Sequence, residues 1–381
     1  MIADIQNTAI PAGPAQSGAA ARVVRSLDDL DQLAAAWDAL AGGAGSPMQQ
    51  FIWARACAES YCRRGGQLHV VTVGPARRPT AIAPLIRQRD MGRLDMLGCE
   101  KWMHEPTDFL YADRPALDAL AGTLASLGRP IYLGRVPADS PTIAALQESY
   151  RRRGLVLCRP ANACPAIALD ATWEEPERQF NAGRRSDLRR ARRNAEKISP
   201  VSCEVLSPSP AELGPLLDEA FQVEAAGWKG LKGSAMAIHA TRGAYYRWYA
   251  VAAAREGILR LCFLRIGGRA AAMQLAVECG ERFWLLKIGY DEEFARCSPG
   301  VLLMLHTVRY AATRGLKSYE LLGRVEPWTR VWAQIERPYV SIRAYPASAL
   351  GLAQLGVDVV GFAWRKLAKV VAHPGFQAVV S

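Results

Sequence analysis

A Ser-Pro-Gly triplet at residues 298–300 precedes an apolar run, Val301–Leu305, that continues with helical spacing to Gly315. Ser298 suits an N-cap, and Pro299 suits the first helical position because its missing N–H costs nothing there. Gly300 leaves the backbone of the first turn bare, so an anion can approach the N–H groups at the positive end of the helix dipole. The triplet therefore predicts either an ordinary capped helix or a site for the phosphate groups of a ligand.

Three further residues could carry chemistry near this triplet. Tyr290 and Asp291 end the strand-like run that leads to it, where Tyr290 could protonate a thiolate and Asp291 could orient an acceptor. Glu224 stands four residues before Trp228 on a predicted helix. A carboxylate desolvated by an indole suits a general base, and the alternative is a surface Glu near a buried Trp. A phosphate site, a base and a proton donor are what acyl transfer from a thioester to an amine or hydroxyl requires.

The remaining candidates are contact residues. Arg296 and Val301 flank the triplet, and we assign them with it to the donor. Residues that we assign to the substrate on the acceptor side are Trp228, Lys229, Lys287 and Trp332, with Arg189 and Arg193 as anion contacts. A lysine in a strand, such as Lys287, more often reaches solvent, which is the alternative there.

A strongly basic segment runs from Arg184 to Lys197, with Leu188, Ala191 and Ala195 at spacings of three and four. This spacing predicts a helix, whose charged face could simply be solvated. It could instead contact the 3′-phosphate of a coenzyme, an anionic acceptor or RNA. RNA is the weakest of these hypotheses, because no recognition signature or aromatic stacking platform accompanies the arginines.

The elements that must position these residues form a regular pattern. The apolar runs 258–266, 270–278 and 282–289 are separated by Gly267-Gly268 and by a turn at 279–281, which predicts an antiparallel meander before the long helix. The N-terminal half shows helical patterns at 27–40, 51–63, 115–127 and 142–153. Its predicted strands are 68–74, 80–87, 94–97, 109–111, 131–133 and 155–157.

The two halves begin their hairpins alike: residues 64–68 and residues 255–259 each follow an aromatic-containing helix, and each hairpin leads to a third strand. We interpret this as a weak internal repeat, hence an α/β fold with mixed sheets in two tandem halves. The expected divisions are a disordered lead at 1–20, an N-terminal half at 21–170, a C-terminal half at 171–347 and a C-terminal helix at 348–381.

The order Glu224…Trp228-Lys229-Gly230, Gly289-Tyr290-Asp291, Ser298-Pro299-Gly300, Glu320-Leu321-Leu322-Gly323 and Trp332 resembles one known group. It is similar to the GNAT-superfamily acyltransferases of the CelD-like branch from cellulose-biosynthesis clusters, relatives of the FemAB aminoacyl transferases. The resemblance covers roughly residues 175–340. Relatives often carry a Lys shortly before the last Trp, whereas this chain has Trp328-Thr329-Arg330-Val331-Trp332.

The resemblance implies two tandem GNAT-like halves, with acetyl-CoA or another acyl-CoA as donor in the C-terminal half and no metal. It implies a small-molecule or saccharide acceptor, in envelope or exopolysaccharide biosynthesis. Two alternatives stay open: a FemAB-like aminoacyl transferase that uses charged tRNA, and a non-catalytic accessory protein of a polysaccharide system.

Composition sets the remaining bounds. The 381 residues carry a net charge of +11, which favours anionic ligands. Nine cysteines without a Cys-x-x-Cys pair indicate core residues in a reducing compartment, so we expect a cytoplasmic protein. Five histidines without zinc-type spacing and the lack of a Gly-x-Ser-x-Gly motif argue against zinc and hydrolase sites. The apolar segment 350–371 predicts a packed terminal helix, with an interfacial membrane helix as the alternative.

Overall fold

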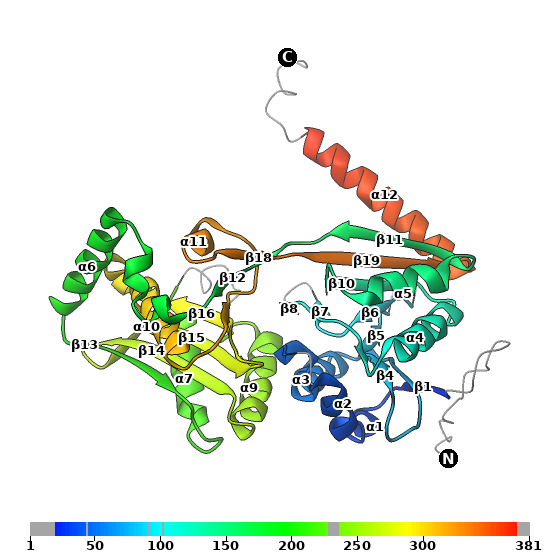
Figure 1. Ribbon diagram of the computed structural model, residues 1–381, viewed down its shortest axis with the longest axis horizontal. Coiled ribbons are helices and arrows are strands. Elements are labelled where there is room, and N and C mark those ends of the chain that lie inside the picture. Colours follow the sequence, from blue (N-terminus) through cyan, green and yellow to red (C-terminus); the bar gives the residue numbers. More distant parts are fainter. Residues whose placement is uncertain (1–19, 43–44, 90–91, 101–102, 228–235, 372–381) are drawn as a thin grey trace.

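The computed structural model describes residues 20–42, 45–89, 92–100, 103–227 and 236–371, which form a mixed α/β fold in two halves (Figure 1). This confirms the expected fold class. The lead at 1–20, apart from residue 20, lies outside the described residues.

The N-terminal half holds three sheets. An antiparallel sheet has the order β1-β3-β4-β9, a mixed sheet has the order β11-β19-β10-β6-β5-β2, and β7 and β8 form a two-stranded sheet. The helices are α1 (Leu27–Asp31), α2 (Ala34–Ala41), α3 (Phe51–Cys62), α4 (Arg114–Ser126) and α5 (Pro141–Tyr150). The strands are β1 (Ala21–Val24), β2 (Gln67–Leu68), β3 (Val70–Val73), β4 (Ala81–Ala83), β5 (Leu85–Arg87), β6 (Leu94–Met96), β7 (Cys99–Glu100), β8 (Met103–His104), β9 (Leu110–Tyr111), β10 (Ile131–Pro137) and β11 (Gly154–Pro160).

The C-terminal half is built on one sheet of seven strands in the order β13-β14-β15-β16-β17-β12-β18. Its strands are β12 (Cys164–Ala168), β13 (Val201–Leu206), β14 (Leu259–Ile266), β15 (Arg269–Cys279), β16 (Arg282–Tyr290), β17 (Ser318–Glu320), β18 (Ile335–Arg337) and β19 (Tyr339–Pro346), the last of which joins the other half. The helices are α6 (Ala182–Glu196), α7 (Leu213–Ala225), α9 (Ala240–Arg255), α10 (Pro299–Thr313), α11 (Pro327–Arg330) and α12 (Ala349–Val371).

The predicted meander is confirmed, since β14, β15 and β16 pair antiparallel in sequence order. The turn between the first two strands needs a backbone that glycine adopts easily, and Gly267 and Gly268 have φ angles of 60° and 81°. Alternate residues of these strands enter two different cores: one with α6 and α10, the other with α7 and α9. The helices therefore cover opposite faces of the sheet.

One expected helix differs from the structure. The pattern over 27–40 predicts a single helix, but the chain forms α1 and α2, with a break at Gln32 and Leu33. Leu30, Leu33 and Trp37 are all buried, so both short helices turn an apolar face inward.

The halves exchange strands. β19 lies between β10 and β11 in the N-terminal sheet, and β12 lies between β17 and β18 in the C-terminal sheet. Arg135 of β10 adds a polar link, because its guanidinium donates to the carbonyl of Gly323, which follows β17, at 2.7 Å. The predicted division at residues 170 and 171 thus does not coincide with a division between the sheets.

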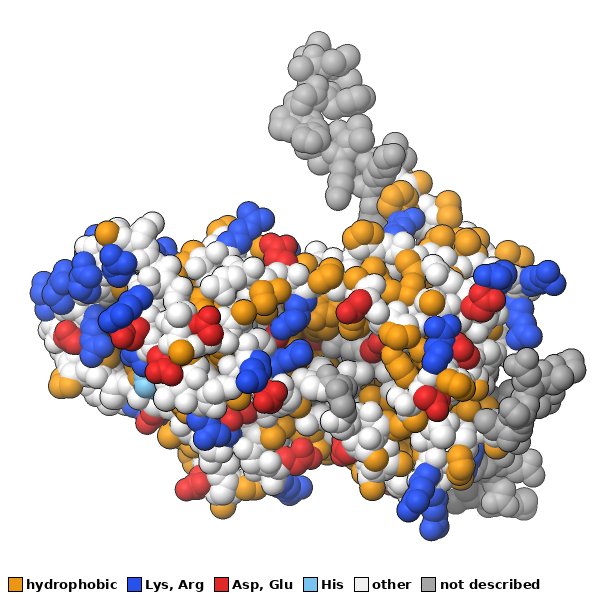
Figure 2. All heavy atoms as spheres, in the orientation of Figure 1, with side chains coloured by type: hydrophobic (Ala, Val, Ile, Leu, Met, Phe, Trp, Pro, Cys, Tyr) orange, Lys and Arg blue, Asp and Glu red, His pale blue; other side chains and the backbone are white. Residues whose placement is uncertain are grey.

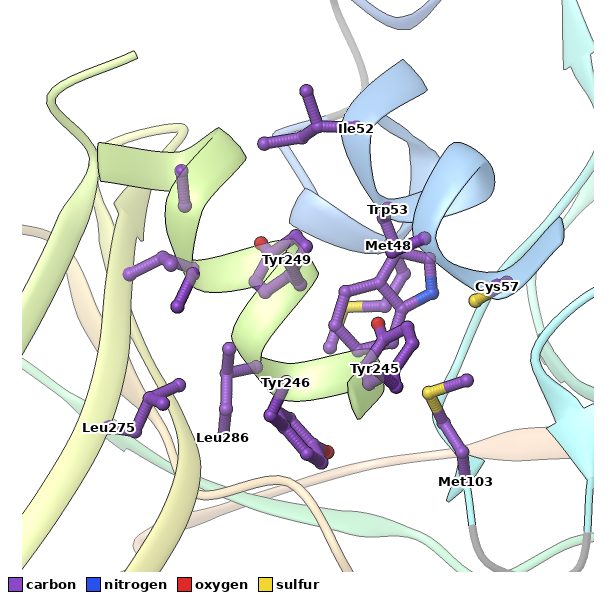
Figure 3. Packing of buried hydrophobic residues seen from close by; sticks show 14 of the residues in the cluster. Met48, Ile52, Trp53, Cys57, Met103, Tyr245, Tyr246, Tyr249, Leu275 and Leu286 are labelled. Carbon is purple, nitrogen blue, oxygen red and sulfur yellow. The ribbon is translucent and has the colours of Figure 1, made fainter. Parts of the chain in front are cut away.

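The halves also share one apolar core, centred where α3 meets α9 (Figure 3). The ring of Trp53 packs edge-on against Tyr245 and Tyr249, with centroid distances of 5.5 and 5.0 Å. This core reaches Leu275 and Leu286 of the C-terminal sheet. Burial on this scale is the main stabilising contribution to the association of the halves.

Candidate functional site

Two parallel strands diverge at the centre of the C-terminal sheet. β16 and β17 pair over Arg282–Trp284 and Ser318–Glu320. Beyond Trp284, β16 continues to Tyr290, whereas the chain after Glu320 leaves the sheet. α10 begins beside the open part, so the sequence order of strand, loop and helix places a helix N-terminus at a gap in the sheet.

A cavity of about 530 Å³ occupies this gap, and we call it the donor cleft. It is lined by seven of the residues that the sequence singled out: Glu224, Tyr290, Ser298, Pro299, Gly300, Val301 and Trp332. Apolar side chains such as Met273, Leu303 and Met304 form much of its wall. The cleft is large enough for a small-molecule ligand, and few of the side chains that line it are polar.

The start of α10 differs in detail from the predicted cap. Ser298 takes the N-cap position, but its backbone is left-handed (φ 45°) and its side chain makes no capping hydrogen bond. The N–H groups of Val301 and Leu302 both donate to the Ser298 carbonyl, at 3.0 and 3.2 Å. Gly300, at the second helical position, has no helical carbonyl four residues back, so its N–H is the one best placed for an anion.

Two hydrogen-bonded clusters of polar side chains, one partly buried and one buried, fix α10 against the sheet. Tyr310 donates to Glu278 of β15 at 2.7 Å, and Arg260 of β14 forms a salt bridge with the same carboxylate at 2.8 Å. Further towards the cleft, the Tyr319 hydroxyl lies 3.1 Å from Thr307 of α10 and donates to Gln274 of β15 at 3.1 Å. The helix N-terminus is therefore held in place relative to β16.

Glu224 lies in the last turn of α7 on the wall of the donor cleft, and its side chain is almost fully buried. Its Oε2 accepts a hydrogen bond from the backbone N–H of Met236 at 2.8 Å. Two glycines allow this position: a Cβ on Gly289 would lie 2.7 Å from Glu224 Cα, and one on Gly227 would lie 2.7 Å from the Tyr290 carbonyl oxygen. Trp228 and Lys229 lie outside the described residues.

Tyr290 ends β16 with its side chain at the cleft. Partial burial raises the pKa of its hydroxyl, and the nearby carboxylate of Glu292 raises this pKa further. The hydroxyl therefore keeps its proton at neutral pH.

Asp291 has a different position from the one expected. It does not line the donor cleft. One of its oxygens accepts from the backbone N–H of Glu293 at 3.0 Å, which caps the short helix 292–297, and the other pairs with Arg269 at 2.5 Å. These contacts hold the connection between β16 and α10, so the structure supports a structural role rather than the predicted contact with an acceptor.

The other predicted contact residues lie away from the cleft wall. The Nζ of Lys287 lies 4.8 Å from the ring centroid of Tyr246, towards α9. Arg296 and Arg193 are exposed. Arg189 lines a second cavity of about 280 Å³ between α6 and α10, together with Arg185, Arg192, His306 and Arg309. Figure 2 shows Lys and Arg side chains gathered over α6.

The assignment from sequence missed four residues that line the donor cleft with a polar or aromatic side chain: Arg184, Gln274, Glu326 and Trp328. Arg184 is the first arginine of the basic segment, and its place near the start of α6 distinguishes it from the rest. Gln274 is buried in a strand, where a polar residue in an apolar run could have indicated a function. Glu326 accepts from the indole N–H of Trp328 at 3.0 Å.

The described residues contain neither a cluster of metal ligands nor a helix that could cross a membrane. No group of three or more His, Cys, Asp or Glu side chains among them could hold a metal ion. No helix in this part of the chain has the length and apolarity needed to cross a membrane.

One stretch of the chain matches a known family model. Residues 182–330 match the family model of the acetyltransferase (GNAT) domain, and this stretch includes α6 to α11 and strands β13 to β17. No curated protein matches the chain in sequence. The CelD-like branch stays a prediction.

Solved structures resemble the chain over both halves. One is described as the C-terminal domain of a "Putative Lysylphosphatidylglycerol Synthetase" from Agrobacterium fabrum, at 11% identity and a TM-score of 0.53, covering 88% of this chain and 97% of that one. FemX aligns at 13% identity and a TM-score of 0.51, covering 81% and 94%. A tandem GNAT protein from the clavulanic acid pathway aligns at 13% identity and a TM-score of 0.44, covering 86% and 99%. At these identities the first two show a shared fold.

Proposed function

We propose that this protein is an acyltransferase that moves an acyl group from acyl-CoA to an amine or hydroxyl acceptor. One observation carries the proposal. The gap between β16 and β17 has the N-terminus of α10 on one side and the buried carboxylate of Glu224 on the other, within one cavity. This arrangement supports a donor and an acceptor that meet at the gap from opposite faces of the sheet.

On the donor side, the Gly300 N–H and the α10 dipole would bind the pyrophosphate of the coenzyme, because both favour negative charge. Arg184 on the cleft wall and Arg296 in the preceding loop add positive charge nearby. The apolar wall around Met273, Leu303 and Met304 suits the thioester arm and the acyl group.

The chemistry follows from the two polar groups that flank the gap. The carboxylate of Glu224 takes a proton from the attacking amine or hydroxyl, whose nitrogen or oxygen bonds to the thioester carbonyl carbon. The C–S bond then breaks, and the Tyr290 hydroxyl gives its proton to the thiolate. The protonated carboxyl group of Glu224 and the tyrosinate return to their starting states by proton exchange through solvent.

For the acceptor we propose a small molecule or a saccharide, with an envelope or exopolysaccharide precursor as the class to try first. The sequence motifs that resemble the CelD-like branch favour this class. Transfer to nitrogen and transfer to oxygen need the same base and the same donor site, so the proposal covers both.

The first experiment identifies the donor. A ligand that binds the native state alone raises the melting temperature, so acetyl-CoA, longer acyl-CoAs and total tRNA are compared by thermal shift. Stabilisation by an acyl-CoA supports the proposal. Stabilisation by aminoacylated tRNA without any effect of acyl-CoA favours the aminoacyl-transferase alternative and overturns it.

The second experiment tests the base. Glu224→Gln keeps the size of the side chain and an oxygen for the Met236 N–H, so the fold should persist while turnover falls by about a hundred- to ten-thousand-fold. The affinity for CoA, measured by calorimetry, should stay unchanged. The readout is thiol release from the acyl-CoA that binds, with a panel of amines and hydroxyl-bearing precursors.

Asp291→Asn is the matched control, because it makes the same carboxylate-to-amide change outside the cleft. Full activity of Glu224→Gln would exclude Glu224 as the base. If no acceptor releases thiol from any acyl-CoA that binds, the non-catalytic alternative replaces the enzyme.

A further inference from the structure

The C-terminal helix α12 presents its polar side to the protein. Asp358 accepts hydrogen bonds from Arg343 at 2.7 Å and from Tyr345 at 2.6 Å, both on β19. Gln354, one turn earlier, is only 5% exposed and donates to the other oxygen of Asp358 at 3.1 Å. A surface helix normally buries its apolar stripe, so the orientation of α12 is the reverse of the usual one.

The outward side of α12 is apolar. Val360 is 69% exposed and Trp364 is 74% exposed. Of the eleven large hydrophobic residues that are exposed in the described part of the chain, seven lie on this helix: Leu350, Leu352, Val357, Val359, Val360, Phe362 and Trp364. Figure 1 shows α12 extending away from the body, and Figure 2 shows hydrophobic side chains gathered on it. An apolar patch of this kind on a surface marks an interaction site.

The width of the apolar side indicates what covers it. At 100° per residue, Val360 lies between Val359 and Leu350 when the helix is viewed along its axis. The arc from Val359 to Leu350 covers about half of the helix circumference. A helix that pairs with one other helix needs only a narrow stripe, whereas a helix that lies in a lipid interface exposes a broad apolar side.

The charges that the sequence carries in this segment favour an anionic surface. From Leu350 to the end of the sequence the only acidic residue is Asp358, which is engaged by Arg343. The sequence also places Arg365, Lys366 and Lys369 in the last turns of α12. Basic residues near a membrane surface bind anionic lipid headgroups, each contributing roughly a fivefold gain in affinity.

We propose that the outward side of α12 binds peripherally to an anionic lipid bilayer, with Leu352, Val357, Val360 and Trp364 entering the interface. Asp358 stays bonded to β19, so the helix lies on the membrane while it remains docked on the N-terminal half. The site is separate from the donor cleft, and the proposal does not depend on the proposed reaction.

The test is flotation of the full chain with vesicles of phosphatidylglycerol and phosphatidylcholine, compared with phosphatidylcholine alone. The wild type should float with the anionic vesicles, and high salt should release part of it. The double variant Val360→Gln and Trp364→Gln should bind at least tenfold more weakly, since it removes two apolar side chains from the lipid contact. Both side chains are largely exposed, so the fold should tolerate the change. Lys366→Gln with Lys369→Gln should weaken binding to the anionic vesicles by about tenfold or more.

Ile238→Gln is the matched control, because Ile238 is 55% exposed and lies outside α12. It should float like the wild type. Circular dichroism checks that every variant is folded. The proposal is overturned if the wild type stays in solution with both kinds of vesicle, or if the α12 variants float as well as the wild type. It is equally overturned if light scattering finds a dimer that the α12 variants convert to a monomer while vesicle binding is absent, since a second copy would then cover the helix.

Discussion

Gly289 sets how closely α7 can approach β16, and so where Glu224 lies. A Cβ on this residue would lie 2.7 Å from Glu224 Cα and 3.0 Å from Glu224 Cβ. Ordinary contact begins at 3.4 Å, so Gly289→Ala requires the two backbones to move apart by about 0.7 Å (3.4 minus 2.7 Å). The atom that must move is backbone, which cannot rotate away as a side chain end would.

The expected cost has two opposing parts. Overpacking a tight contact costs about 1–3 kcal/mol. Replacing glycine by alanine returns roughly 0.5–1 kcal/mol by restricting the unfolded chain. Gly289→Ala should therefore lower the free energy of unfolding by up to about 2.5 kcal/mol. Because a 1 Å misplacement of a catalytic group can cost about a hundredfold in rate, turnover should fall by about tenfold to a hundredfold.

Gly214→Ala provides the comparison, since Gly214 lies on the same helix and a Cβ there meets no atom within 4 Å. It should be as stable as the wild type or slightly more stable, with unchanged turnover. Urea unfolding gives the stabilities, thiol release gives the turnover, and calorimetry with CoA should give an unchanged affinity for both variants. Equal stability and equal turnover for Gly289→Ala and Gly214→Ala would refute the close packing of α7 on β16.

Two further outcomes follow from single residues. Gly300→Val should weaken CoA binding by about tenfold or more, since the branched carbons of valine fill the space in front of the helix N–H. The new Cβ would lie 3.7 Å from the Tyr290 ring, so it fits without strain. An unchanged affinity by calorimetry would place the phosphates elsewhere. Burial, with Arg25, Arg129 and Arg87 nearby, lowers the pKa of His69 to about 4. The unfolded chain then binds more protons between pH 6.5 and 4, so the protein should lose up to roughly 3 kcal/mol as the pH falls through that range. His69→Gln should lack this part of the pH dependence in urea unfolding, and an unchanged profile would exclude His69 as its source.

The local elements of the C-terminal half could be predicted from sequence because their signals are local. The Gly267-Gly268 turn specifies the hairpin, and Pro299 specifies where α10 begins. Strand exchange could not be predicted in this way. The partners of β12 and β19 lie far along the chain, so the pairing is set by the assembled sheets rather than by any pattern within the strands.

The candidate site shows the same limit. Glu224, Tyr290 and the triplet at 298–300 were placed together because each lies at the end of an element that leads towards the same gap. Asp291 looks equivalent in sequence, but one residue further along, past the end of the strand, its carboxylate meets Arg269 and the helix 292–297 instead. Lys287 likewise faces α9. Sequence order indicates which elements a residue lies near, but the local backbone conformation decides whether its side chain faces the cleft or points away from it.

The strand exchange constrains how the site can respond to ligands. Each half contributes a strand to the sheet of the other, and α3 and α9 share one core. A hinge motion between the halves would have to break the ladders of β19 with β10 and β11 or open the contacts around Trp53. Since buried hydrogen bonds left without partners are costly, such a motion is unfavourable. Adjustment to an acceptor should therefore come from connections that border the donor cleft, such as the one that carries Glu326 before α11.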